Sequence, residues 1–173
     1  MKILAVDTAT RSCSAAVIDG EALLAETTNT SNQTHSRHLL DTIDAVIEQA
    51  GLEITELDGF AVSNGPGSFT GLRIGIASIK GLAFSLGKPV VGVSSLDALA
   101  WQCAQSAYLI CPLLDARKKE VYACRYRYKN NELKKEYSFS SNKKLPTKYT
   151  KLSINTEILQ LLRRQLLPAP GLL

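Results

Sequence analysis

A glycine-rich segment at residues 63–75 constrains the fold of this chain more than any other feature. It reads S-N-G-P-G-S-F-T-G-L-R-I-G. Residues 59–62 before it are typical of a short buried strand, and residues 71–86 have the apolar period of a helix. A strand, a glycine-rich turn and a helix place free backbone N–H groups where anions or partner groups dock. The glycine spacing differs by one residue from the dinucleotide fingerprint, and no lysine follows as a P-loop requires.

The helix predicted over residues 71–86 carries two stripes, one of small residues and one of apolar residues. Each interior glycine costs about 1 kcal/mol of helix stability relative to alanine, so tertiary contacts must hold this helix. Either the small stripe lets the helix lie close to its own sheet, or it admits a second helix at short range. Two distinct stripes favour the second interpretation. The small stripe is Gly71, Gly75, Ser78, Gly81 and Ser85, and the apolar stripe is Leu72, Ile76, Ile79, Ala83 and Leu86.

Local patterns elsewhere predict a mixed sheet with helices packed on it. Three strands in a hairpin series are followed by alternating helices and strands, the order that gives such a sheet. A second region begins near Tyr108. The predicted strands are 3–6, 13–18, 21–26, 59–62, 90–93, 108–114 and 121–128, with a turn at Asp19-Gly20; the further helices run from a Thr34 or Ser36 cap to about Ala50 and from a Ser94 or Ser95 cap to about Gln105.

Several motifs resemble, in the same order, the TsaB (YeaZ) family of bacterial tRNA threonylcarbamoyladenosine biosynthesis proteins. The resemblance covers about residues 1–128. It implies an α/β fold like that of actin and the heat-shock-chaperone ATPases, a ribonuclease-H-like mixed sheet with flanking helices, plus an incomplete second lobe. The motifs are MKILAVDTAT at residues 1–10, CSAAV at 13–17, QTHSRHLL at 33–40, the glycine segment at 65–75, GVSSL at 92–96 and DARKKEVY at 115–122.

The same resemblance divides the chain into three parts. Residues 1–106 form a first lobe for dimerisation and partner docking, and residues 107–137 begin the second lobe. Residues 138–173 form a divergent basic tail, loop-like at 138–144 and weakly helical at 154–167. A truncation, a change of reading frame and a divergent natural terminus would each produce this tail.

The resemblance implies a non-catalytic, cytoplasmic scaffold subunit. Its partners would be the catalytic subunit TsaD, the ATPase TsaE and a second copy of itself. It would meet tRNA only indirectly, through the complex, and would need no membrane and no cofactor. TsaD carries an H-x-x-x-H metal pair where this chain has Ser95 and Leu99, so we expect neither a metal nor catalytic residues. The expected interface residues are His38, Asp41, Gly71, Arg73, Gly75, Ser78, Gly81 and Ser85.

The alternative is a stand-alone ATP-dependent enzyme of the same fold. Asp7 ends the first strand, where ATPases of this fold position metal-bound phosphate, and Thr8 and Ser68 are weaker cofactor-binding candidates. The turn after Asp7 lacks the glycine that lets backbone approach a phosphate. A turn role for Asp7 and a helix cap at Ser68 are the competing interpretations. His35 and His38 lie three apart, which favours a cap or surface pair over a metal site.

Charge is distributed unevenly along the chain. Residues 1–116 hold six Lys and Arg against twelve Asp and Glu, a net charge of −6, whereas residues 117–173 hold fourteen against four, a net charge of +10. A basic tail either binds RNA through phosphates, as an independent RNA-binding module would, or is solvated surface. The four cysteines show no C-x-x-C spacing and are interpreted as free core thiols. No run of eighteen apolar residues and no signal peptide is evident.

Overall fold

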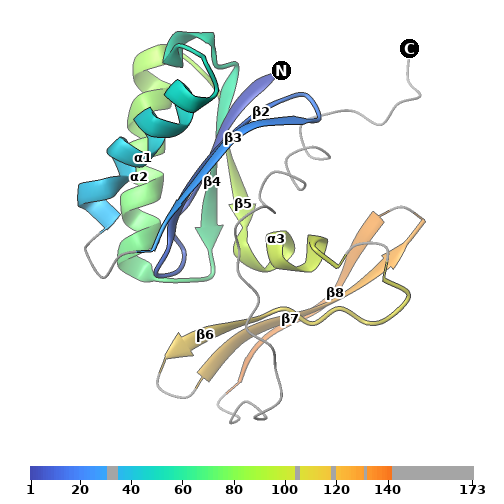
Figure 1. Cartoon of the computed structure of the whole chain (residues 1–173). Coiled ribbons are helices and arrows are strands. Elements are labelled where there is room, and N and C mark those ends of the chain that lie inside the picture. Colours follow the sequence, from blue (N-terminus) through green and yellow to red (C-terminus); the bar gives the residue numbers. More distant parts are fainter. Residues whose placement is uncertain (31–34, 104–105, 118–119, 131, 142–173) are drawn as a thin grey trace.

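Apolar runs at the start of the chain form the centre of a five-stranded sheet in the computed structural model (Figure 1). The structure describes residues 1–30, 35–103, 106–117, 120–130 and 132–141, without the side chains of residues 35–37 and 137–141. The strand order is β3-β2-β1-β4-β5, with β1 antiparallel to β2 and parallel to β4. The strands are β1 (Lys2–Asp7), β2 (Cys13–Asp19), β3 (Ala22–Asn29), β4 (Gly59–Gly65) and β5 (Val90–Ser94).

Two long helices lie side by side on one face of this sheet (Figure 1). They are α1 (His35–Gln49) and α2 (Phe69–Leu86). Alternate residues of β1 point to opposite faces, as strand geometry requires. Leu4 and Val6 pack under the two helices, whereas Ile3 and Ala5 belong to a second cluster on the other face. The mixed sheet with flanking helices predicted from the sequence is confirmed.

The boundaries of α2 follow from its capping residues. Ser68 is the N-cap, and its hydroxyl accepts from the Gly71 N–H at 3.3 Å. Gly87 ends the helix with a φ of +63°, a conformation that glycine adopts at little cost. By length and composition alone, α2 is long and apolar enough to cross a membrane. In this fold α2 instead packs along β4 and against β1.

A three-stranded antiparallel sheet follows, in the order β6-β7-β8 (Figure 1). The strands are β6 (Leu113–Arg117), β7 (Glu120–Lys129) and β8 (Glu132–Ser141). The strand predicted from residue 108 begins only at Leu113, although Ile110 already forms a bridge with Tyr126 in the same register. Pro112 lies between them, and proline has no N–H to donate to a ladder.

The loop predicted from residue 138 is wrong for residues 138–141, which belong to β8. Their pairing with β7 continues to Val121 opposite Ser141. Polar serine residues mask the strand pattern here, and the partner strand decides the conformation. The remainder of the predicted tail, including residues 154–167, lies outside the described residues.

The short helix α3 (Ser95–Trp101) joins the two sheets. Ser94 caps it, accepting from the Asp97 N–H at 3.2 Å. Tyr126, which is 2% exposed, donates its hydroxyl hydrogen to Asp97 Oδ1. Burial and this hydrogen bond raise the pKa of Tyr126 far above its ordinary value. The rings of Trp101 and Tyr128 meet edge to face at 6.3 Å, so α3 and β7 share one packed junction.

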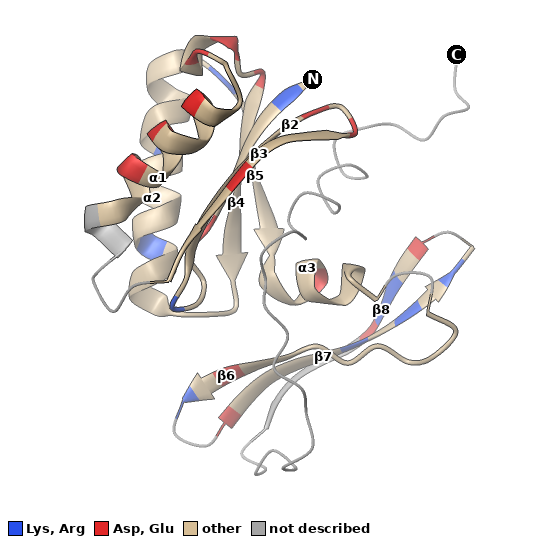
Figure 2. Ribbon diagram, in the orientation of Figure 1, with Lys and Arg blue, Asp and Glu red and all other residues tan. Residues whose placement is uncertain are grey.

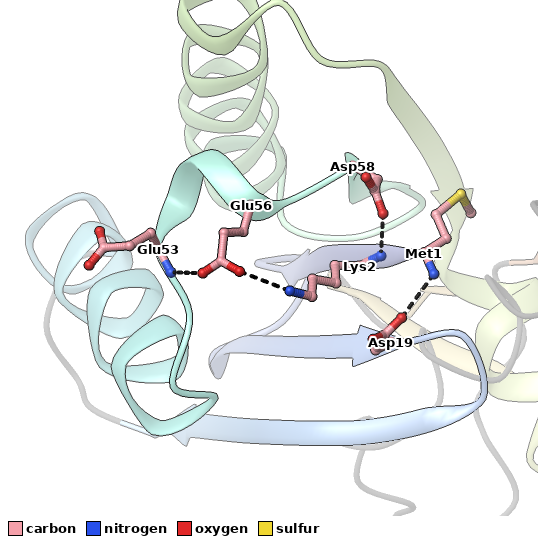
Figure 3. A network of polar contacts seen from close by, with 6 residues as sticks. All are labelled: Met1, Lys2, Asp19, Glu53, Glu56 and Asp58. Carbon is pink, nitrogen blue, oxygen red and sulfur yellow. Dashed lines mark hydrogen bonds and ion pairs between the residues drawn. The ribbon is translucent and has the colours of Figure 1, made fainter.

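Polar contacts link the beginning of β1 to neighbouring parts of the first sheet (Figure 3). The Met1 ammonium group pairs with Asp19 at 2.9 Å, which ties β1 to the end of β2. Lys2 Nζ pairs with Glu56 at 3.0 Å, and Glu56 also accepts from the Glu53 N–H at 2.8 Å. Glu56 lies on the single 3-10 turn η1 (Ile54–Glu56), so these contacts fix the approach to β4.

The four cysteines divide by exposure, which corrects the interpretation of all of them as core thiols. All four are free, but Cys103 and Cys111 are exposed whereas Cys13 and Cys124 are buried. Burial raises the pKa of the Cys13 thiol, which further suppresses its reactive thiolate. We expect DTNB to label two thiols rapidly in the native protein and all four in denaturant. Rapid labelling of four thiols without denaturant would contradict this burial pattern.

Candidate docking face on the helical layer

The start of α2 lies against the turn between β1 and β2. The Thr8 hydroxyl donates to the Gly71 carbonyl at 2.8 Å, and the Ser68 N–H donates to the Ala9 carbonyl at 2.7 Å. A Cβ atom at Gly75 would overlap Thr8 Oγ1, and one at Gly67 would lie 2.8 Å from the Ala9 Cβ. These glycines let the helix and the turn approach closely.

The small stripe of α2 therefore does not form one outward surface. Gly71 and Gly75 are buried, Ser78 is half-buried, and Gly81 and Ser85 are exposed. Gly81 has nothing within 4 Å of its would-be Cβ. The five small residues repeat on average every 3.5 residues, and such a repeat drifts by about 20° per seven residues on a 3.6-residue helix. The expectation that all five face a partner is wrong for Gly71 and Gly75, because they pack on their own sheet's turn.

The outward surface of α2 carries large apolar side chains at both ends. Phe69 is 73% exposed and Phe84 is 90% exposed. The Arg73 guanidinium lies over the Phe69 ring at 5.3 Å from its centre, a cation–π geometry that holds both side chains on this surface. Ala77 and Lys80 lie between them and are also exposed. Aromatic residues left in water on a regular helix are typical of an interaction site.

The outward surface of α1 is apolar at one point and acidic along its length. Leu40 is 53% exposed, and Asp41, Asp44 and Glu48 are exposed beside it. His38 is half-buried, and its backbone carbonyl accepts from the Thr42 hydroxyl at 2.6 Å. The side chain of His35 lies outside the description. We call the outer surface of α1 and α2 the docking face; it comprises Leu40, Asp41, Asp44, Glu48, Phe69, Arg73, Ala77, Lys80, Gly81 and Phe84.

Sequence reasoning placed Asp41, Arg73 and Gly81 at this surface but missed Phe69 and Phe84. Neither aromatic residue falls on the small stripe or on the apolar stripe of α2. An apolar residue outside the buried stripe of an amphipathic helix is itself a signal, because such a position faces solvent unless a partner covers it.

The three cofactor-binding candidates all make hydrogen bonds within the chain. Asp7 is buried, and its Oδ1 accepts from the Ala9 N–H at 2.9 Å. Thr8 is buried and bonds to α2, and Ser68 caps that helix. The turn role of Asp7 and the capping role of Ser68 are confirmed. Within the described ranges, no three His, Cys, Asp or Glu side chains gather as a metal site would require.

Comparisons with known proteins identify relatives that match most of the chain. A family model described as TsaD, tRNA N6-adenosine threonylcarbamoyltransferase, matches residues 22–159. The tRNA threonylcarbamoyladenosine biosynthesis protein TsaB of Bacillus subtilis is 35% identical over 133 residues, which are 77% of this chain and 58% of that protein. The chain thus spans less than two thirds of the length of this relative.

Solved structures agree with the sequence comparison. YeaZ from Pseudomonas aeruginosa superimposes with a TM-score of 0.74 at 31% identity, covering 86% of this chain and 71% of that one. Component A of (R)-2-hydroxyglutaryl-CoA dehydratase from Acidaminococcus fermentans reaches a TM-score of 0.52 at 13% identity, covering 83% of this chain and 48% of that one. The latter likeness concerns the fold alone. The actin-like, ribonuclease-H-like fold expected from the sequence is confirmed.

Proposed function

Because the chain belongs to the TsaB (YeaZ) family of tRNA threonylcarbamoyladenosine biosynthesis proteins, we propose that it is a non-catalytic scaffold subunit whose docking face binds TsaD. In this proposal TsaE joins the same complex, and the complex modifies tRNA in the cytoplasm. The observation that carries the proposal is Phe84, which is 90% exposed near the C-terminal end of α2, with a second exposed aromatic residue, Phe69, at the other end of the same helix.

Charge complementarity supports a partner built like the chain itself. Among the described side chains, the exposed charges of α1 are acidic, at Asp41, Asp44 and Glu48, whereas those of α2 are basic, at Arg73 and Lys80. A two-fold arrangement sets α1 of one molecule against α2 of the other, so opposite charges meet. The family model that matches this chain is that of TsaD, which indicates a related first lobe. TsaD and a second copy of this chain therefore compete for one docking face.

The arrangement around the first turn supports a role without nucleotide chemistry. The side-chain oxygens of Asp7, Thr8 and Ser68 are engaged in turn and helix contacts. The Ala9 carbonyl accepts from the Ser68 N–H, which puts the turn directly against the β4–α2 loop. A phosphate would have to displace contacts that hold α2 on the sheet.

Replacing Phe84 with aspartate tests the docking face. We expect the Kd for TsaD to rise by at least about 30-fold, equivalent to about 2 kcal/mol, because buried aromatic anchors dominate such interfaces. The matched control is Tyr108→Asp, since Tyr108 is 82% exposed and lies outside the docking face. Calorimetric titration with purified TsaD gives both affinities, and circular dichroism checks that the variants fold.

Sedimentation of the chain alone provides the second readout. Phe84→Asp is expected to abolish self-association at concentrations where the wild type and Tyr108→Asp still pair. An F84D variant that is folded and binds TsaD with wild-type affinity would show that the partner docks elsewhere.

A further inference from the structure

A second surface of the chain carries a row of cations. Alternate residues of β7 face opposite sides of its sheet. Tyr122, Cys124 and Tyr126 pack in the cluster with α3, so Arg125, Arg127 and Lys129 lie on the other side. Lys134 of β8 is the register partner of Arg127 and shares its side. We call these four residues, Arg125, Arg127, Lys129 and Lys134, the basic face.

The basic face places like charges next to each other. Arg127 stands directly opposite Lys134, an arrangement that destabilises a sheet. Glu136 forms ion pairs with both arginines, at 2.9 Å from Arg127 and 3.6 Å from Arg125. Lys134 pairs with Glu132 at 3.8 Å. In the described part of the chain, the ion pairs of the basic face thus engage two carboxylates, fewer than its four cations, so the face has an excess of positive charge.

The cations of the basic face are accessible. Arg125 is 43% exposed, Arg127 39% and Lys134 56%. Lys135, on the opposite side, lies 4.0 Å from Asp97 and belongs to the α3 junction instead. Along β7, successive cations are about 6.7 Å apart, because two strand residues span that distance. A row of regularly spaced cations suits a partner with regularly spaced anions.

The charge of the described residues is polarised in the same sense (Figure 2). Acidic residues are spread over α1, η1 and the β2–β3 hairpin, whereas basic residues gather where β7 and β8 meet at their hairpin end. The docking face lies on the far side of the first sheet from β7 and β8 (Figure 1). A partner on the docking face leaves the basic face open.

We propose that the basic face binds the phosphate backbone of tRNA directly. The proposal rests on the proposed function, which brings the chain to a tRNA-modifying complex, and it replaces the expectation of purely indirect contact. Cations that meet phosphates fix position and orientation but carry no sequence information. The contact would therefore hold any tRNA, while recognition of the modified base belongs to another subunit.

The salt dependence of tRNA binding tests this contact. The double variant Arg125→Ala/Arg127→Ala is compared with the wild type by fluorescence anisotropy of labelled tRNA between 50 and 200 mM salt. Each lost phosphate contact lowers the slope of log K against log salt by about 0.9, so we expect a change of nearly two. At about 0.1 M salt this corresponds to a 10- to 60-fold weaker affinity. Arg125→Lys/Arg127→Lys keeps the charge and is expected to retain most of the binding.

Matched variants separate this inference from the docking proposal. Arg11→Ala/Lys88→Ala removes two cations that lie outside both the basic face and the docking face, and it is expected to leave the slope unchanged. Arg125→Ala/Arg127→Ala should still bind TsaD, and Phe84→Asp should still bind tRNA. An unchanged slope in the folded Arg125→Ala/Arg127→Ala variant overturns the proposal, as does an equal loss of slope in the Arg11→Ala/Lys88→Ala control. If the wild-type chain binds polyglutamate but does not bind tRNA, the proposal is also overturned, and the partner of the basic face is an acidic protein.

Discussion

Gly75→Ala is expected to lower the free energy of unfolding by about 1 to 3 kcal/mol, although alanine is the better helix former. The added methyl group would overlap Thr8 Oγ1 and contact the other Thr8 side-chain atoms at 3.4 Å. Thr8 is fully buried and its hydroxyl donates to the Gly71 carbonyl, so rotating this side chain away would break that hydrogen bond. The helix or the turn must shift, and the hydrogen bond is strained or lost. Urea denaturation followed by circular dichroism measures the change.

Gly81→Ala is the matched control in the same helix. Its methyl group meets nothing within 4 Å, so only the gain in helix propensity remains. We expect this variant to be more stable than the wild type by up to about 1 kcal/mol. Thr8→Ala combined with Gly75→Ala should recover part of the loss, because it removes the overlapped hydroxyl group. Equal stability changes in Gly75→Ala and Gly81→Ala would mean that α2 does not lie against the first turn as described.

Tyr126→Phe is expected to cost about 1.5 to 3 kcal/mol, the range for hydrogen bonds to charged groups. The hydroxyl of this buried side chain donates to the Asp97 carboxylate across the junction between α3 and β7. Removing it leaves Asp97 with the Ser94 hydroxyl at 3.0 Å and Lys135 at 4.0 Å. Trp101 is the only tryptophan of the chain and touches Tyr128 at this junction, so its fluorescence reports the same event.

Tyr122→Phe provides the control, because Tyr122 packs beside the same cluster and the described residues offer it no side-chain hydrogen bond. It is expected to change stability by less than about 0.5 kcal/mol. A double-mutant cycle with Asp97→Ala isolates the pair, and a coupling energy near zero would show that the two side chains do not interact.

Much of the first lobe could be predicted because its signals are local. Ser68 caps α2 as predicted, Ser94 is one of the two predicted caps of α3, and Asp19-Gly20 makes the expected turn, with Gly20 at a φ of +55°. Capping and turn chemistry depends on a few neighbouring residues, so a sequence displays it directly. The second sheet was harder to predict. Residues 138–141 become a strand through pairing with β7, a contact that no local pattern encodes.

The candidate site was predicted only in part, for a related reason. Spacing identified α2 as an unusual helix but did not fix which of its sides meets the sheet. The orientation of α2 depends on Thr8, whose hydroxyl donates to the Gly71 carbonyl. The two residues are more than sixty positions apart in the sequence. Once Gly71 and Gly75 face inward, Phe84 must face outward, and the docking face follows from the rotation of the helix.

The close packing of α2 against the first turn also affects how a partner protein binds the docking face. A helix whose glycines interlock with a buried threonine can neither roll about its axis nor slide along the sheet without unpacking that contact. The backbone that carries the exposed Phe69 and Phe84 therefore keeps its position before any encounter. Binding then needs no rearrangement of the backbone, and interaction energy is not consumed in ordering the surface. The rate of complex formation should be set by diffusion and orientation, with the helical layer acting as a rigid, preorganised template.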